Sequence, residues 1–155
     1  MRIQSILVIC TGNICRSPMG ERILQRHIQA IAVSSAGTHG LSGQPAEPQA
    51  IAVAAAHGVS LDNHVAHMLT TAMLKQHDLI LAMEQAHINH ISQIAPEIRG
   101  KTLLFGQWLE KQEIPDPYGR DGEAFEYVFR LLDAASREWA KRLKVKELRT
   151  CRRTH

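Results

Sequence analysis

The sequence is short of cysteine, of long apolar runs and of any targeting signal, and each shortage excludes a class of protein. Three cysteines in 155 residues cannot build the disulfide framework of a small secreted domain, and the odd count fits a reducing compartment. No apolar run approaches the ~20 residues that a membrane-spanning helix needs. Residues 1–5 have neither the apolar core nor the cleavage site of a signal peptide. We therefore expect a cytoplasmic protein that does not insert into a membrane.

A strong overall charge is also absent, because the formal net charge is only +3. Residues 141–155 hold seven Lys or Arg residues and one Glu, so the rest of the chain carries a net negative charge. A protein with this distribution is not basic throughout, and we expect no nucleic-acid partner. We expect a domain over residues 1–143 and a basic C-terminal tail over residues 144–155. The tail is interpreted as a solvated helix end, and contact with RNA or anionic lipid is the alternative.

What the chain does have is a regular alternation of short apolar runs with helical patterns. Its length and its hydrophobic content of 45% suffice for the core of one domain. The patterns predict strands at 3–9, 32–37, 78–83 and 101–104, and helices at 18–30, 45–57, 70–76, 84–94 and 122–143, with 105–113 partly helical. Strands that alternate with helices predict a single α/β domain, in which a doubly wound four-stranded parallel sheet is covered on both faces.

One loop, between the first predicted strand and the first predicted helix, has unusual chemistry. It reads C-T-G-N-I-C-R-S-P, from Cys10 to Pro18. Open α/β sheets bind ligands at this end of their strands. Gly12 and Asn13 tolerate the positive φ that turns successive backbone N–H groups inward, and with a helix N-terminus such groups form an anion cradle. Ser17 is expected at the N-cap of the helix and Pro18 at its first position.

Cys10 and Arg16 are the reactive pair of this loop. Arg16 supplies a planar fork of donors that suits two phosphate oxygens. The same positive field favours the thiolate form of Cys10, and a thiolate that faces a bound oxyanion can attack phosphorus. The alternative is a buried structural cysteine in a tight turn. We disfavour it because the strand, the Gly-Asn pair, the arginine spacing and the Ser-Pro helix start all agree.

The pattern C-x5-R-S, with Gly-Asn inside it and an apolar strand before it, resembles the low-molecular-weight protein tyrosine phosphatases. The resemblance covers about residues 3–143. It implies the strand order 2-1-3-4 and hydrolysis of phosphotyrosine through a cysteinyl-phosphate. Cys10 would be the nucleophile, and Arg16 with the loop amides would stabilise the transition state. The resemblance implies no metal and no other cofactor, and His87 and His90 are interpreted as surface residues.

Asp116 is the candidate for the acid that protonates the leaving group. It lies between Pro115 and Pro117, which stiffen the loop. Taken alone, Pro-Asp-Pro is ordinary turn chemistry. Followed by Tyr118, and in a chain that also has the cysteine–arginine loop, it matches the Asp-Pro-Tyr acid loop of the family. The resemblance implies that Asp116 protonates the phenol and then acts as base on the hydrolytic water.

Supporting residues are also implied by the resemblance. Ser17 is expected to stabilise the thiolate of the nucleophile in addition to capping the helix. Asn13 is expected to hold the strained loop through Ser35 and His64. For these two residues the plainer interpretations, a strand-end serine and a surface histidine, stay open.

Cys15 matches the second cysteine of the family, which forms a reversible disulfide with the nucleophile and shields it from deeper oxidation. Cys151 has no counterpart. The substrate is expected to contact the loop side chains and backbone together with two residues further along the chain, which gives the set Thr11, Gly12, Asn13, Ile14, Cys15, Leu41 and Tyr118.

Four segments resemble the bacterial enzymes of exopolysaccharide or capsule production, namely Leu41 and residues 95–97, 104–106 and 113–118. Gly119 stands where many animal members have a second tyrosine, so regulation through paired tyrosines is not expected. In the bacterial group the partner is a membrane tyrosine autokinase with a tyrosine-rich tail. The resemblance therefore implies a phosphotyrosine protein of this kind as substrate.

Three other functions remain as alternatives. Thioredoxin-coupled arsenate reductase shares the loop but needs two further cysteines near positions 80–90, and no cysteine lies between Cys15 and Cys151. Protein arginine phosphatase has threonine in place of Ile14 and phenylalanine in place of Tyr118. A non-catalytic phosphate-binding module would be expected to have lost the nucleophile or the acid, and both are present.

Overall fold

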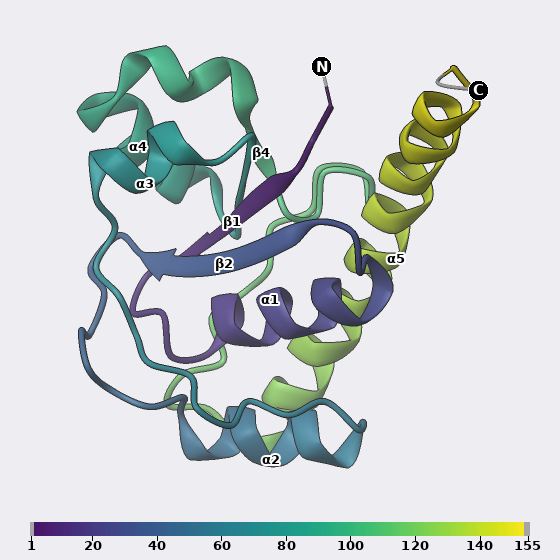
Figure 1. Cartoon of the computed structure of the whole chain (residues 1–155). Coiled ribbons are helices and arrows are strands. Elements are labelled where there is room, and N and C mark those ends of the chain that lie inside the picture. Colours follow the sequence, from purple (N-terminus) through teal and green to yellow (C-terminus); the bar gives the residue numbers. More distant parts are fainter. Residues whose placement is uncertain (1, 154–155) are drawn as a thin grey trace.

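The computed structural model describes the backbone of residues 2–153 and the side chains of residues 2–143. The described residues form a parallel four-stranded sheet in the order β2-β1-β3-β4 (Figure 1). This is the α/β fold and the strand order that the sequence and the resemblance predicted. The strands are β1 (Ser5–Cys10), β2 (Ala32–Gly37), β3 (Leu79–Ala82) and β4 (Thr102–Leu104).

Helices cover both faces of this sheet. One face packs against α1 and α5, with α2 lying outside them against both helices, and the other face packs against α3, α4 and the short 3-10 helix η1 (Figure 1). None of the described helices is long and apolar enough to cross a membrane. Their bounds are α1 (Arg16–His27), α2 (Pro48–Ala56), α3 (Thr71–Gln76), α4 (Gln85–Ile94), η1 (Pro96–Lys101) and α5 (Gly122–Arg153).

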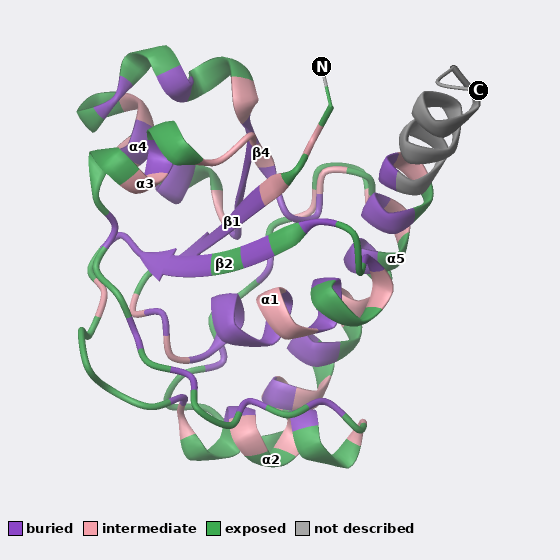
Figure 2. Cartoon of the chain, in the orientation of Figure 1, coloured by how far each residue is buried: buried purple, intermediate pink, exposed green. Residues whose placement is uncertain are grey.

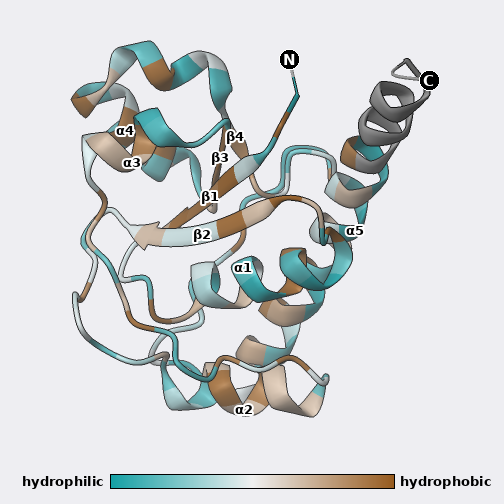
Figure 3. Cartoon of the chain, viewed as in Figure 1, coloured by the Kyte–Doolittle hydropathy of each residue, from teal (hydrophilic) through white to brown (hydrophobic). Residues whose placement is uncertain are grey.

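The central strand β1 is buried on both sides. Ile6 and Val8 belong to the core cluster under α1 and α5, while Leu7 and Ile9 belong to the cluster under α4. Such a strand needs an almost continuous apolar run, which is the pattern seen along β1 in Figures 2 and 3. Because β1 is fixed from both faces and both edges, its carboxyl end is a rigid support for Cys10.

The start of α1 differs from the prediction. The helix begins at Arg16 with Cys15 as its N-cap residue, so the prediction that Ser17 is the N-cap was wrong. The Ser17 hydroxyl is instead held by Cys10 and Asn13. These tertiary hydrogen bonds outweigh the local preference of serine for a cap position.

Other boundaries differ in smaller ways. The first strand begins at Ser5 rather than at residue 3, and α1 ends at His27 because Ile28 is extended, with φ −132°. The second predicted helix begins only at Pro48, since the Glu47 carboxylate accepts hydrogen bonds from the first backbone N–H groups of α2.

The segment 105–113 is not partly helical, as the pattern had indicated, but consists of turns closed by a bridge between Gly106 and Gln112. The last helix continues beyond residue 143, and its backbone runs to Arg153. The predicted boundary of the basic tail therefore falls inside α5. The side chains of residues 144–155, Cys151 among them, lie outside the described part of the structure.

Candidate active site

The candidate site is a cavity of about 230 Å³ at the carboxyl end of β1, where the chain turns into α1. We call residues 10–16 the anion loop. None of the backbone N–H groups of residues 11–15 donates a hydrogen bond within the described part of the chain. The loop therefore leaves a set of donors available to an oxyanion. The cavity is lined by Cys10, Thr11, Gly12, Ile14, Cys15, Arg16, His39, Leu41, Asp116 and Tyr118.

The turn of the anion loop depends on Asn13 rather than on Gly12. Asn13 has φ +60°, whereas Gly12 is not among the residues with positive φ. Of the two residues that tolerate a positive φ, only Asn13 therefore adopts one. A different glycine is required: a Cβ on Gly37, at the end of β2, would lie 2.3 Å from the carbonyl oxygen of Thr11. The loop is thus packed directly against the neighbouring strand.

Asn13 holds the loop through both ends of its side chain. Its Nδ2 donates to Ser17 Oγ at 2.6 Å and to Ser35 Oγ at 3.0 Å, and its Oδ1 accepts from the His67 backbone N–H at 2.9 Å. Its backbone carbonyl accepts from His64 Nε2 at 2.7 Å. All of these contacts are buried or half-buried. A left-handed asparagine whose side-chain amide and backbone carbonyl are all paired is well fixed.

Ser35 and His64 are therefore neither a plain strand-end serine nor a surface histidine. Burial lowers the pKa of His64, so the ring is neutral and carries its hydrogen on Nε2, facing the Asn13 carbonyl. Ser35 Oγ donates onward to Glu21 Oε1 at 2.8 Å. Glu21 was not predicted, because only the packing of α1 beside β2 brings it to the loop.

Ser17 lies beside the sulfur of Cys10. The Cys10 Sγ and Ser17 Oγ atoms are 2.9 Å apart. Ser17 Oγ already accepts the Asn13 amide hydrogen, so its own hydrogen is available to Cys10. A hydroxyl that donates to sulfur stabilises the thiolate form. The geometry suits a cysteine that reacts as an anion.

Cys15 is chemically different from Cys10, although both are buried free cysteines. Burial raises the pKa of the Cys15 thiol, and the neighbouring charges of Cys10, Glu47 and Asp116 raise it further. Two thiols close together do not both ionise easily. Cys15 therefore stays a protonated thiol within the anion loop.

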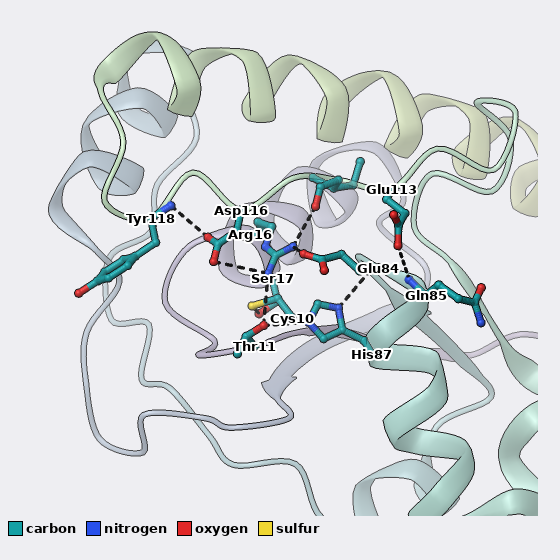
Figure 4. Close-up of polar contacts among 11 residues, drawn as sticks. Cys10, Thr11, Arg16, Ser17, Glu84, Gln85, His87, Glu113, Asp116 and Tyr118 are labelled. Carbon is teal, nitrogen blue, oxygen red and sulfur yellow. Dashed lines mark hydrogen bonds and ion pairs between the residues drawn. The ribbon is translucent and has the colours of Figure 1, made fainter.

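Arg16 is only 2% exposed. Its Nη1 donates to the Ile114 carbonyl oxygen at 2.9 Å and to the Glu84 carboxylate. Its Nη2 donates to Thr11 Oγ1 at 3.3 Å and lies 3.9 Å from Asp116 Oδ2 (Figure 4). A buried cation is tolerated only when it is paired in this way, and the pairing fixes the guanidinium at the edge of the cavity.

Sequence reasoning missed two partners of Arg16, Glu84 and Ile114, although the first of them could have been found. Glu84 follows β3, which is adjacent to β1 in the sheet, so the two strand ends meet at the same edge. Topology therefore places a carboxylate beside the anion loop. The carbonyl of Ile114 depends on the path of a long connection, for which the sequence has no signal.

Asp116 and Tyr118 form the outer wall of the cavity. Asp116 Oδ1 accepts the Tyr118 backbone N–H at 3.0 Å, which leaves Oδ2 facing Arg16 and the cavity. Tyr118 is 62% exposed and is among the lining residues, and its ring points away from Cys10 and Arg16 (Figure 4). Leu41 lines the cavity from the 38–44 loop, and its N–H donates to the Gly12 carbonyl oxygen at 3.0 Å. An acid and an apolar wall thus meet above the anion loop.

Two histidines depart from the predictions. His87 is buried, so its interpretation as a surface residue was wrong; its Nε2 lies 2.9 Å from Thr11 Oγ1. His39 lines the cavity and had not been singled out, since nothing in its sequence context distinguishes it. The side chain of Asn13, a residue expected to contact the substrate, lies behind the loop, so only its backbone N–H remains for such a contact. Within residues 2–143 no cluster of three or more His, Cys, Asp or Glu side chains is arranged to hold a metal ion.

Comparison with known proteins is consistent with this geometry. Residues 5–149 match the family model described as low molecular weight phosphotyrosine protein phosphatase. The low molecular weight protein-tyrosine-phosphatase Etp of Escherichia coli K12 is 57% identical over 143 residues, which cover 92% of this chain and 97% of that protein.

Two solved structures show what this fold can contain. The tyrosine phosphatase Wzb from Escherichia coli K30, solved in complex with sulphate, is 51% identical, with a TM-score of 0.89 over 91% of this chain and 99% of that one. The arginine phosphatase YwlE from Geobacillus stearothermophilus has the same TM-score at only 28% identity, over 94% of this chain and 96% of that one. The fold alone therefore does not select the substrate.

Proposed function

The chain belongs to the low molecular weight phosphotyrosine protein phosphatase family, and we propose that it hydrolyses phosphotyrosine through a cysteinyl-phosphate formed on Cys10. One observation carries the proposal: Cys10, Arg16 and Asp116 line the same cavity, although Asp116 is far from the other two in the sequence. Nucleophile, anion cradle and acid are the three groups that the reaction requires.

In the first step the Cys10 thiolate attacks phosphorus in line with the tyrosine oxygen. The S–P bond forms as the P–O bond to tyrosine breaks, and the electron pair of that bond remains on the phenolic oxygen. Arg16 and the free N–H groups of residues 11–15 hold the three equatorial oxygens, whose charge grows in the transition state. Because Arg16 is already fixed by Glu84 and Ile114, little reorganisation is needed.

Asp116 completes both steps as acid and then as base. It gives its proton to the departing phenolate, which would otherwise be a poor leaving group. A water molecule then attacks the cysteinyl-phosphate, Asp116 removes a proton from that water, and the S–P bond breaks to restore the thiolate. The hydrogen from Ser17 stabilises the thiolate at the beginning and at the end of the cycle.

The rim of the cavity supports an aromatic substrate. Leu41 and Tyr118 offer an apolar slot above the anion loop, which suits a flat ring that extends from the bound phosphate. We propose that the physiological substrate is a membrane tyrosine autokinase of exopolysaccharide or capsule production, and that the enzyme acts on its tyrosine-rich tail in the cytoplasm. The resemblance of Leu41 and residues 95–97, 104–106 and 113–118 to that bacterial group supports this choice.

Two accessory assignments belong to the same proposal. Cys15 forms a reversible disulfide with Cys10 under oxidation and so protects the nucleophile; its position in the lining of the same cavity supports this role. Residues 144–155 form a basic tail appended to the phosphatase domain of residues 1–143.

Kinetics with Cys10 and Asp116 variants test the mechanism. Cys10→Ser is expected to abolish turnover of p-nitrophenyl phosphate and of a phosphotyrosine peptide. Asp116→Asn is expected to lower kcat by about 10²–10⁴-fold with KM little changed. The loss should be larger for the peptide, because p-nitrophenolate is the better leaving group. Asp121→Asn is the matched control, since Asp121 caps α5 through the Ala124 N–H and an asparagine can keep that bond.

Undiminished activity in Cys10→Ser would exclude the mechanism, and equal losses in Asp116→Asn and Asp121→Asn would exclude Asp116 as the acid. The same preparation, assayed with phosphoarginine peptides and with arsenate plus thioredoxin, tests the two related activities. Turnover of either substrate above that of the phosphotyrosine peptide would contradict the proposed substrate.

A further inference from the structure

His87 lies directly behind the anion loop, at the start of α4. It is 4% exposed, and both of its ring nitrogens are engaged. Nδ1 lies 3.1 Å from the backbone nitrogen of Glu84, and Nε2 lies 2.9 Å from Thr11 Oγ1 (Figure 4). The proposed mechanism uses neither His87 nor the side chain of Thr11.

The first of these contacts determines the position of the ring hydrogen. A backbone N–H can only donate, so Nδ1 of His87 accepts the hydrogen of Glu84. Burial lowers the pKa of His87 to about 4, and the Arg16 charge contributes to the same shift. The ring is therefore neutral at physiological pH, its single hydrogen is on Nε2, and it donates to Thr11 Oγ1.

The second contact then determines the direction of the Thr11 hydroxyl. Oγ1 accepts from His87 Nε2 and, at 3.3 Å, from Arg16 Nη2. A hydroxyl oxygen has two acceptor positions and one hydrogen. With both acceptor positions occupied, only the hydrogen remains, and within the described residues no hydrogen bond requires it. Thr11 lines the cavity beside Cys10 and Arg16, so this hydrogen is available to a ligand of the anion loop.

We propose that Thr11 donates its hydroxyl hydrogen to the bound phosphoryl group, and that His87 is the positioning residue that directs this hydrogen into the cavity. The inference rests on the proposed function, because it concerns the same oxyanion. It adds one side-chain donor to the loop amides and Arg16. It also means that α4, which does not contact the substrate, affects the reaction through the hydrogen bond from His87 to Thr11.

Substitutions at Thr11 test the donor. Thr11→Val keeps the shape of the side chain and removes the hydroxyl, and we expect kcat/KM for p-nitrophenyl phosphate to fall by about tenfold to a hundredfold. We expect competitive inhibition by inorganic phosphate to weaken in the same variant. Thr11→Ser keeps the hydroxyl and is expected to stay within about threefold of the wild type. Equal kinetics in Thr11→Val and the wild type would overturn the inference.

Substitutions at His87 separate positioning from a purely structural role. Asparagine can replace Nδ1 as the acceptor for the Glu84 N–H but is too short to reach Thr11. Glutamine is long enough to bring an amide N–H close to the position of Nε2. Positioning predicts that His87→Gln retains more kcat/KM than His87→Asn. A structural role predicts equal activities or the reverse order, and either result would exclude positioning. Asn89→Ala, on the exposed side of α4, is the matched control and should leave kinetics unchanged.

The double variant completes the test. If His87 acts through Thr11, then adding His87→Asn to Thr11→Val causes no further loss, whereas independent effects would multiply and contradict the proposal. Thermal unfolding of each variant identifies losses that come from misfolding, and the Thr11 pair remains decisive even if His87→Asn does not fold. Wild-type turnover of the phosphotyrosine peptide tests the proposed function separately from these ratios.

Discussion

At the scale of single residues, Asn13 has an unfavourable backbone conformation and a buried polar side chain, and its hydrogen bonds compensate for both. Its φ of +60° is unfavourable for a residue with a side chain, and its amide must be paired because it is fully buried. The contacts with Ser17, Ser35 and His67 satisfy the amide completely. The side chain of Asn13 therefore fixes the conformation of the anion loop.

Replacing Asn13 should damage both stability and catalysis. Asn13→Ala removes three side-chain hydrogen bonds but keeps the left-handed backbone, so we expect a loss of about 2–4 kcal/mol in the free energy of unfolding, measured with urea. We also expect kcat to fall by at least about tenfold, since the loop amides lose their support. Asn63→Ala is the control: Asn63 also has positive φ, +66°, but is exposed. Equal losses in the two variants would show that backbone strain, not the network, is what matters.

Residues of the site divide into those that local sequence predicts and those that it does not. Cys10 and Arg16 lie in a motif whose residue types and spacing already indicate their chemistry, whereas Asp116 was singled out because Pro-Asp-Pro-Tyr resembles the acid loop of the family. Glu84 and His87 lie in an ordinary helix start, and they matter only because β3 pairs with β1. Pairing between distant strands gives no signal in the sequence around Glu84 and His87. The contacts of Glu84 with Arg16 and of His87 with Thr11 were therefore not predicted.

At the scale of secondary-structure elements, the end of β2 is part of the active-site architecture. Gly37 pairs with Cys10 in the sheet, and its Cα faces the backbone of the anion loop. The close approach leaves no room for a side chain, because the nearest atoms are backbone atoms that cannot rotate away.

A methyl group at this position is expected to displace the loop. Gly37→Ala should lower the stability by about 1–3 kcal/mol or more, which for a domain of this size corresponds to a fall of roughly 3–10 °C in Tm. It should also lower kcat/KM, because the carbonyl that must move belongs to Thr11. Gly100→Ala is the matched control, since a Cβ there meets no atom within 4 Å. A wild-type Tm and kcat/KM in Gly37→Ala would show that the loop adapts freely.

The starts of α1 and α2 show when a local capping signal in the sequence is overridden by tertiary contacts. Ser-Pro is a strong helix start, yet α1 begins two residues before Pro18. The Ser17 hydroxyl forms hydrogen bonds with Cys10 and Asn13 and therefore does not cap the helix. Glu47 is the opposite case: its carboxylate caps α2 in the ordinary way, and the helix starts later than the apolar pattern indicated. A cap signal is reliable only when the side chain has no other partner.

At the scale of the whole molecule, two buried histidines link folding to pH. Burial lowers the pKa of both His87 and His64, for His87 to about 4. In the unfolded chain a histidine binds a proton near pH 6.5. Between about pH 4 and 6.5 the unfolded state therefore holds protons that the folded state does not, and stability falls as the pH falls through this window.

The pH dependence of unfolding measures this coupling. We expect the free energy of unfolding to rise from pH 4.5 to pH 7, with a contribution from His87 on the order of 2 kcal/mol. The slope should be smaller in His87→Asn. His90→Asn is the control, because His90 is three positions further along α4 and is only half-buried. An unchanged slope in His87→Asn would mean that the ring is protonated in the folded protein as easily as in the unfolded one.

The fold as a whole was the most predictable level. Four apolar runs separated by helical patterns indicate a parallel sheet, and the buried run of β1 indicates a central strand. The order of the strands came from the resemblance, because periodicity does not say which strands are neighbours. The length of α5 could not be set by its apolar stripe, since the predicted stripe ends at Leu143 and the backbone helix continues to Arg153.

The central place of β1 has a consequence for biosynthesis. The ribosome makes the anion loop before both of the strands that flank β1, and it makes Asp116 later still. A nascent chain therefore carries Cys10, the proposed nucleophile, before it has a sheet to hold the loop or Asp116, the proposed acid. We therefore expect activity only after the chain up to Asp116 has left the ribosome, and we expect its recovery after refolding to report assembly of the complete sheet.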